Sequence, residues 1–262
     1  MRFELLFFKT VDSSIGRVDH ESLSQQALME MVIGEITNKE KICGDVDEPK
    51  DIEEWKGVEI EDGEVFGIDW SHYGLRGSVH LEWLPISVRK FLVGWSNLTG
   101  TLDLACLPTP MKHLDLRHNT FTGPIDLERL PERMEYLCVS KNQLSGSLNL
   151  ASLPGTLQDL VAHNNKFSGS VDLTQLPAAL TQLDISENEL SGSVVLTQLS
   201  GSLSYLYLSR NQFSGSLDLT RLPPNIESFN FSWNRLSGEG FIPDEIFERV
   251  NVRYTKVIKR RT

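Results

Sequence analysis

One stretch of this chain, Leu203 to Asn225, decides its fold and reads LSYLYLSRNQFSGSLDLTRLPPN. The same 23-residue pattern recurs without insertion from residue 65 to residue 248, which makes eight copies. The thirteenth position is glycine in every copy, and the ninth is asparagine in six of them, a regularity that chance does not produce. Self-similarity of this length is typical of solenoid proteins, in which each copy forms one turn and stacks on the next.

Each feature of the repeat has a structural interpretation. At the fourth and sixth positions, such as Leu206 and Leu208, apolar residues alternate with polar ones, which predicts a short strand with one buried face. One such strand cannot bury its face alone, so the copies must pair as a parallel sheet at about 4.8 Å spacing and share a core. The asparagine after the strand turns the chain, and its amide can satisfy the backbone groups at the bend. Because 23 residues leave little room for a helix, we expect irregular or 3₁₀ segments and short strands on the opposite side.

The positions L-x-x-L-x-L-x-x-N-x-L/F-x-G of this pattern resemble leucine-rich repeats, and the Leu-Ser-Gly-Ser wording resembles those of plant receptor-type ectodomains and of short-repeat protist proteins. Upstream, Trp55-Lys-Gly57-Val58 is similar to the W-x-G-V segment that ends the plant-type amino-terminal cap. Glu53 and Glu59 stand where that family has paired cysteines. The resemblance implies a right-handed, curved solenoid with a parallel sheet on its concave side, and a binding module without catalytic activity.

The chain divides into three segments. Residues 1–64 are predicted to be an amino-terminal capping segment with one amphipathic α-helix, residues 65–248 hold the eight repeats, and residues 249–262 form a carboxyl-terminal cap with a basic tail. Caps are required because a terminal repeat would otherwise expose its apolar face. We expect the amino-terminal helix to span Glu21–Val32 with Asp19 as its cap. The apolar stripe predicted to face the core is Leu23, Ala27, Leu28 and Met31.

At the carboxyl end, the sequence predicts a short helix over Pro243–Arg249, with proline in its first turn. Residues Val250–Ile258 then alternate as one strand that would cover the last repeat. The basic tail Lys259–Arg261 is interpreted as a frayed, solvated terminus.

The composition excludes several classes of protein. A net charge of −11 disfavours binding to nucleic acid or to anionic lipid, and no apolar run approaches the roughly 18 residues of a membrane-spanning helix, so we expect no membrane insertion. Cys43, Cys106 and Cys138 form no C-x-x-C pair, which argues against a disulfide scaffold or a zinc site. These observations favour a cytoplasmic protein that is a monomer on its own, with a secreted or cell-surface location as the alternative.

The titratable and nucleophilic residues predict no enzyme, no metal site and no cofactor. His72 and His118 occupy the same position two copies apart, a separation of about 9.6 Å that is too wide for one metal ion. Cys138 neighbours Asp115 across one strand step, but no histidine in phase completes a nucleophilic set.

A row of carboxylates at the sixteenth position could bind calcium. We favour the interpretation that each one accepts a backbone N–H bond at a turn. The row consists of Asp103, Asp126, Asp172 and Asp218.

The remaining candidate is a surface. Side chains at the third, fifth, seventh and eighth positions are predicted to point from the sheet into the concave face, and binding hot spots favour Trp, Tyr and Arg. The candidate partner-binding residues are Trp95, Arg117, His118, Tyr136, Lys141, Tyr205, Tyr207, Arg210 and Trp233. The predicted function is a non-enzymatic protein–protein interaction module that binds a protein partner on this face. The alternatives are a structural or adaptor subunit that uses its caps, and a cell-surface or secreted recognition receptor fragment.

Overall fold

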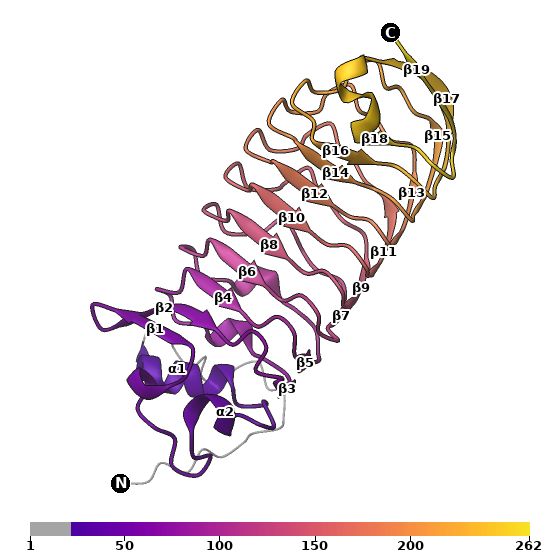
Figure 1. Ribbon diagram of the computed structural model, residues 1–262. Helices are drawn as coiled ribbons and strands as arrows, with labels where there is room; N and C mark the ends of the chain where they lie inside the picture. The colour runs from indigo at the N-terminus through magenta and orange to yellow at the C-terminus, as the bar shows by residue number, and fades with distance from the viewer. Residues whose placement is uncertain (1–21) are drawn as a thin grey trace, which may run out of the picture.

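Each repeat contributes one short strand to a ten-stranded sheet in the computed structural model, which describes residues 22–262 (Figure 1). All neighbouring strands pair in parallel except β1 and β2, which form an antiparallel hairpin. Leu160 pairs with Leu183, 23 residues further on, so the register of the sheet equals the repeat length. The strands in spatial order are β1 (Val58–Glu61), β2 (Glu64–Asp69), β4 (Lys90–Leu92), β6 (His113–Asp115), β8 (Tyr136–Cys138), β10 (Asp159–Val161), β12 (Gln182–Asp184), β14 (Tyr205–Tyr207), β16 (Ser228–Asn230) and β18 (Val250–Asn251).

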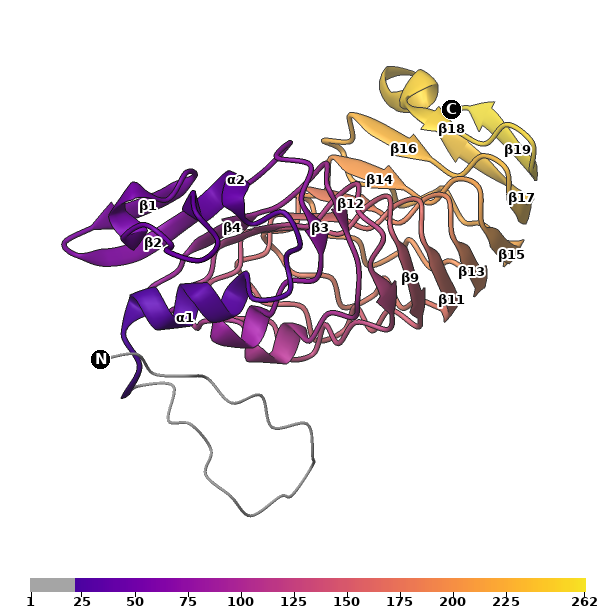
Figure 2. The same ribbon diagram turned by 90° about the horizontal axis from the view of Figure 1, so that it is seen from below.

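The opposite side of the solenoid carries the expected short strands and 3₁₀ helices (Figure 2). The first two repeats have the 3₁₀ helices η3 (Leu81–Trp83) and η4 (Leu104–Cys106) and the short strand pair β3 (Arg76–Gly77) and β5 (Asn97–Leu98). Later repeats form a second sheet of seven strands: β7 (Thr122–Gly123), β9 (Gln143–Gly146), β11 (Lys166–Ser170), β13 (Glu189–Gly192), β15 (Gln212–Ser216), β17 (Arg235–Ile242) and β19 (Lys256–Arg261). Because paired strands repeat at about 4.8 Å on both sides, the body in Figure 1 is long and bends only gently.

A single hydrophobic core fills the space between the two sheets along the whole stack. The fourth and sixth positions supply fully buried side chains, such as Leu206 and Leu208. From the second repeat on, the eleventh position alternates between leucine and phenylalanine, so each phenylalanine lies between two smaller side chains. These side chains, all with no exposed surface, are Leu98, Phe121, Leu144, Phe167, Leu190, Phe213 and Leu236.

The repeated asparagine joins neighbouring turns, as the sequence predicts. Asn142 accepts a hydrogen bond from the Phe121 backbone N–H at 3.1 Å, and its amide donates to the carbonyls of Leu116, Val139 and Ser140 at 3.0 to 3.2 Å. The side chain is only 8% exposed. A buried backbone group without a hydrogen-bond partner is costly. The Asn142 amide provides partners for backbone groups at the bend of its own turn and in the turn before it.

The repeated glycine is required by backbone conformation and by close packing. Gly146 has φ +85°, a region that side chains with a Cβ rarely adopt, and an added Cβ would lie 3.1 Å from the Cβ of Pro124 in the preceding turn. In the first repeat, Gly77 has φ +101°, and a Cβ there would lie 2.0 Å from the backbone oxygen of Glu35. This glycine therefore lets the amino-terminal segment approach the first turn closely.

The amino-terminal cap contains the expected helix, with a different start and a different buried face. Helix α1 spans Gln25–Val32, and the Ser24 hydroxyl caps it by accepting the Ala27 N–H at 3.2 Å; Asp19 and Glu21, where the sequence predicts the start, lie outside the described residues. Leu28, Met29 and Val32 are buried, whereas Ala27 and Met31 of the predicted stripe are only partly so.

Two short elements complete this cap, the helix α2 (Glu40–Cys43) and the 3₁₀ helix η2 (Ile52–Glu54). Two buried tryptophans pack with them. Trp55 and Trp70 are buried and donate their indole N–H groups to the carbonyls of Lys50 and Lys56. The Trp55 segment therefore packs as a structural part of the cap, in keeping with its resemblance.

The carboxyl-terminal segment differs from the prediction of one covering strand. The expected helix is the 3₁₀ helix η5 (Asp244–Arg249), preceded by Pro243. After it, β18 continues the first sheet and β19 continues the second, so residues 249–262 form a further partial turn.

The basic tail is an ordered strand and not a frayed terminus, because β19 pairs with β17 from Lys256 to Arg261. Two of its charged side chains are also paired. Arg260 contacts Glu239, and Arg261 contacts Asp244 at 2.8 Å and Glu248 at 3.0 Å. These exposed ion pairs add to the backbone pairing that holds β19 against the preceding turn.

Candidate interaction surface

The solvent-facing side of the ten-stranded sheet, the predicted concave face, carries all nine candidate residues. Three of them lie on strands: Tyr136 on β8, and Tyr205 and Tyr207 on β14. In β10, β12 and β14 the middle side chain is buried and the outer two are more exposed, as the alternation predicts, whereas in β8 Cys138 is buried as well as Leu137. The other six follow the strands, where the chain turns: Trp95, Arg117, His118, Lys141, Arg210 and Trp233.

Along one margin of the concave face, the residue at the eighth position of every turn has a left-handed backbone. Its φ lies between +53° and +62°, a region that is uncommon for residues other than glycine. The conformation recurs whichever side chain occupies the position, and the residue that follows is asparagine in six of these turns and Tyr73, Ser96 or Thr255 in the other three. We call this row the edge ladder; its members are His72, Trp95, His118, Lys141, Asn164, Glu187, Arg210, Trp233 and Tyr254.

The amino-terminal part of the edge ladder is an aromatic stack. The Trp95 indole lies between two imidazoles, with ring centroids 5.3 Å from His72 and 3.5 Å from His118 and interplanar angles of 15°. Trp95 is nevertheless 48% exposed. This stack unites His72 and His118, which the sequence analysis compares only as metal ligands, with Trp95. The repeat position that the two histidines share with Trp95 was the signal that could have revealed the stack.

The carboxyl-terminal part of the edge ladder combines a cation with two rings. Arg210 places its guanidinium carbon 5.6 Å from the centre of the Trp233 ring, and Trp233 stacks on Tyr254 with a centroid separation of 4.0 Å. Trp233 and Tyr254 are 49% and 66% exposed. Tyr254 was not among the predicted residues, because it lies beyond the last full repeat.

Arg117 and Tyr136 are held together by contacts with each other and with Asp115. The Arg117 guanidinium pairs with the carboxylate of Asp115 at 2.6 to 2.9 Å and also hydrogen-bonds with the Tyr136 hydroxyl. The hydrogen bonds to Asp115 raise the pKa of Arg117, and burial raises the pKa of Tyr136, so both groups keep their usual protonation at neutral pH. These contacts hold the Arg117 and Tyr136 side chains in one arrangement. A partner could bind to this cluster without moving either side chain.

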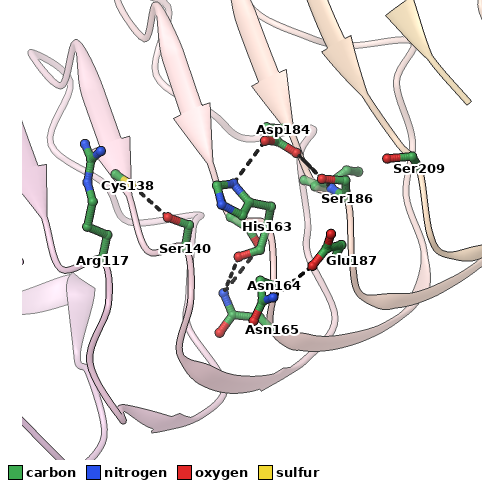
Figure 3. Close-up of polar contacts among 12 residues, drawn as sticks. Arg117, Cys138, Ser140, His163, Asn164, Asn165, Asp184, Ser186, Glu187 and Ser209 are labelled. Carbon is green, nitrogen blue, oxygen red and sulfur yellow. Dashed lines mark hydrogen bonds and ion pairs between the residues drawn. The ribbon is translucent and has the colours of Figure 1, made fainter. Parts of the chain in front are cut away.

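A histidine and a carboxylate meet in the middle of the concave face (Figure 3). His163 Nδ1 lies 3.0 Å from Asp184 Oδ2, an ion pair when the imidazole is protonated, although the contact is poorly aligned for a hydrogen bond. Asp184 also accepts the Ser186 hydroxyl at 2.6 Å. The Cys138 thiol bonds with Ser140, not with His163, and burial raises the pKa of Cys138. A protonated thiol is a poor nucleophile, so this group does not form a catalytic set.

The carboxylate row acts in turn formation, as we favoured from the sequence. Asp103, Asp126, Asp172 and Asp218 each accept a hydrogen bond from the backbone N–H two residues further on, at 2.8 to 3.0 Å. Hydrogen bonds from Thr174 and Thr220 lower the pKa of Asp172 and Asp218. Within residues 22–262, no three His, Cys, Asp or Glu side chains are arranged to hold a metal ion.

The electrostatics of the edge ladder can be tested at His118. Burial lowers the pKa of this imidazole, and the neighbouring positive charges of Lys141 and Arg117 lower it further. Replacing Lys141 with asparagine, which Asn164 shows to fit the same backbone conformation, removes one of these charges. We expect Lys141→Asn to raise the pKa of His118, followed by NMR titration of its ring protons.

The matched control for this titration is Lys166→Gln. Lys166 is an exposed residue on β11 of the second sheet, and the equivalent position is glutamine in β9 and in β15, at Gln143 and Gln212. This substitution should leave the His118 titration unchanged. A His118 pKa that stays the same or falls in Lys141→Asn would show that Lys141 does not act on this ring.

Comparisons with known proteins agree with this geometry. The sequence model of the family described as Leucine Rich Repeat matches residues 202–222, and a search of curated proteins finds no match. The crystal structure of a pollen receptor kinase 3 is similar with a TM-score of 0.58 and 24% identity, over 77% of this chain and 99% of that one. A plant ice-binding protein is similar with a TM-score of 0.53 and 21% identity, over 90% and 95% of the two chains.

A third structure is that of the Arabidopsis receptor kinase HAESA in complex with the peptide hormone IDA and the co-receptor SERK1. It is similar with a TM-score of 0.52 and 21% identity, over 89% of this chain and half of that one. These comparisons lend no support to the predicted cytoplasmic location, because receptor ectodomains are among the similar structures. Within residues 22–262, no helix has the length and apolarity needed to cross a membrane. The repeat pattern, the stacked parallel strands and these similarities together identify the chain as a leucine-rich-repeat solenoid.

Proposed function

We propose that this protein is a non-enzymatic binding module that recognises a protein partner through its concave face. The observation that carries the proposal is the cluster at the carboxyl-terminal end of that face, where Tyr205, Tyr207, Arg210, Trp233 and Tyr254 lie together on neighbouring turns. Large aromatic side chains exposed as a group are unfavourable in water, and such groups mark binding sites. The similar fold of HAESA, solved with a peptide hormone and a co-receptor, supports a polypeptide partner.

The test is affinity capture from cells with the intact chain and with a Tyr207→Asn/Arg210→Asn variant. Both replacements use residues that occupy the same repeat positions elsewhere, Asn230 and Asn164, so the turn should fold normally. We expect the variant to bind the captured partner at least about tenfold more weakly, the usual effect of removing hot-spot side chains. Binding would be measured by titration of the purified partner.

The control variant carries Lys166→Gln and Arg235→Gln on the second sheet and should bind as the intact chain does. If the Tyr207→Asn/Arg210→Asn variant retains full affinity, the concave face is not the binding surface. That outcome would favour the alternative of a structural or adaptor subunit that binds through its caps.

A cell-surface or secreted recognition protein is the second candidate. The ectodomain of the plant membrane receptor kinase GASSHO1/SCHENGEN3 has a similar fold, with a TM-score of 0.52 and 19% identity over 89% of this chain, and this observation favours the candidate. All three cysteines are free, and Cys43 and Cys138 are buried, so the fold depends on no disulfide. Detection of the native protein in a membrane or culture-medium fraction would distinguish this candidate from a cytoplasmic module.

A further inference from the structure

The two exposed tryptophans of the edge ladder present their ring edges to solvent, because other groups cover their faces. Trp95 is stacked between His72 and His118, and Trp233 lies between Tyr254 and the Arg210 guanidinium. A sugar ring binds an aromatic side chain by lying on an open face, so these stacks are poor carbohydrate platforms. Their half-exposed rims instead offer flat apolar contacts for aliphatic or aromatic side chains.

The separation of the two stacks sets a length for the partner. Trp95 and Trp233 occupy the same position in repeats that are six turns apart. At about 4.8 Å per turn the two indoles are about 29 Å apart, and an extended polypeptide covers that distance in about nine residues. Because the stack bends only gently, one straight segment can reach both rims (Figure 1).

The surface between the stacks has its own charge. Asp159 and Asp184 lie on the neighbouring strands β10 and β12, and the polar groups nearest to them are the Thr181 and Ser186 hydroxyls and the His163 imidazole. Among the ion pairs of residues 22–262, none joins either carboxylate to a lysine or arginine. On the edge ladder between the two tryptophans, Lys141 lies one turn before β10, and Glu187 pairs with Arg210 at 3.7 Å. A cation on the partner would therefore be favoured over β10 and β12, beside Asp159 and Asp184 and midway between the two apolar contacts.

From these observations we infer that the partner segment is extended, carries two apolar side chains about nine residues apart that contact the Trp95 and Trp233 stacks, and has a positively charged residue between them. This inference rests on the proposed function and adds the chemistry of the segment. The two contacts act as linked sites, so a segment that reaches both binds more tightly than one that reaches a single stack.

The experiment uses the intact chain and synthetic 13-residue peptides of Ser, Thr and Gly that contain two phenylalanines. In the first peptide the phenylalanines are nine residues apart with a lysine midway; in the second they are three residues apart; in the third the lysine is replaced by glutamate. Binding is measured by calorimetry. We expect the first peptide to bind at least about tenfold more tightly than either of the others, since a second contact adds to the first.

Two variants assign the contacts. Trp95→Asn and Trp233→Asn introduce the residue that Asn164 places in the same ladder position, so the left-handed backbone is kept. Each variant should reduce affinity for the first peptide about tenfold. The affinity for the second peptide should change much less, because this peptide can bind to the remaining stack. Lys166→Gln on the second sheet is the control and should change neither affinity.

The inference is wrong if no peptide binds, if the spacing of the phenylalanines or the sign of the central charge has no effect, or if both tryptophan variants bind the first peptide normally. The peptide comparison on the intact chain decides the matter even where a variant folds poorly. A negative peptide result together with loss of partner capture in Tyr207→Asn/Arg210→Asn would reject the two-contact inference and keep binding at the concave face.

Discussion

Replacing Phe167 with alanine is expected to reduce the free energy of unfolding by about 4 kcal/mol, the usual cost of removing a buried phenyl ring and leaving a cavity. Phe167 has no exposed surface and belongs to the alternating row at the eleventh position. The turns before and after it carry the smaller Leu144 and Leu190 at that position, so no large neighbour is placed to refill the space. Chemical denaturation followed by circular dichroism gives the measurement.

Phe167→Leu is the matched control for this prediction. Leucine occupies the same position in the adjacent turns, and a substitution that keeps most of the volume should cost about 1 kcal/mol. The reverse change, Leu144→Phe, should also destabilise the protein, because it would place three large rings on consecutive turns. Equal stability of Phe167→Ala and Phe167→Leu would contradict a close-packed core at this row.

Asn142→Ala is expected to cost about 3 kcal/mol, since it leaves buried backbone groups without partners. The side chain accepts one hydrogen bond from the preceding turn and donates to three carbonyls, and solvent has little access to replace them. Loss of these bonds should also loosen the contact between the two turns. We expect faster hydrogen exchange at the Phe121 N–H in addition to lower stability.

Asn164→Gly provides the control on a neighbouring turn. Asn164 is exposed, its side chain donates a hydrogen bond to the Glu187 carboxylate at 2.8 Å (Figure 3), and its φ of +56° suits glycine. This variant should stay within about 0.5 kcal/mol of the parent, as surface substitutions usually do. If Asn142→Ala were as stable as Asn164→Gly, the asparagine ladder would not be what joins the turns.

The repeated part of the fold was predictable because each structural requirement recurs once per turn. Leu206 and Leu208 reveal a strand by their alternation, and Gly215 and Asn211 mark its turn by their constant spacing. The caps lack this redundancy. No repeated position marks the start of the amino-terminal helix, which begins at Gln25 with Ser24 as its cap and not at the predicted Glu21; likewise β18 and β19 separate because each extends a different existing sheet edge.

The candidate surface was predicted in its composition but not in its internal contacts. Tyr205, Tyr207 and Trp233 were identified as residues of this face, because their repeat positions predict that their side chains point away from the core. The stack of His72, Trp95 and His118 was missed, because a metal search considers ligand distance and not ring contact. Pairing of Arg117 with Asp115 also depends on side-chain conformations that a repeat pattern does not specify.

Hydroxyl-radical footprinting of the chain, alone and bound to the partner recovered by affinity capture, is the measurement that most directly tests recognition by the concave face. Indole and phenol rings react rapidly, and Trp95, Tyr205 and Trp233 are at least 38% exposed. Phe241, 51% exposed on the second sheet, reports on the opposite side. If the partner binds the concave face, it should slow oxidation of these three residues and leave the oxidation rate of Phe241 unchanged. Protection of Phe241, with unchanged rates at Trp95, Tyr205 and Trp233, would contradict binding at the concave face.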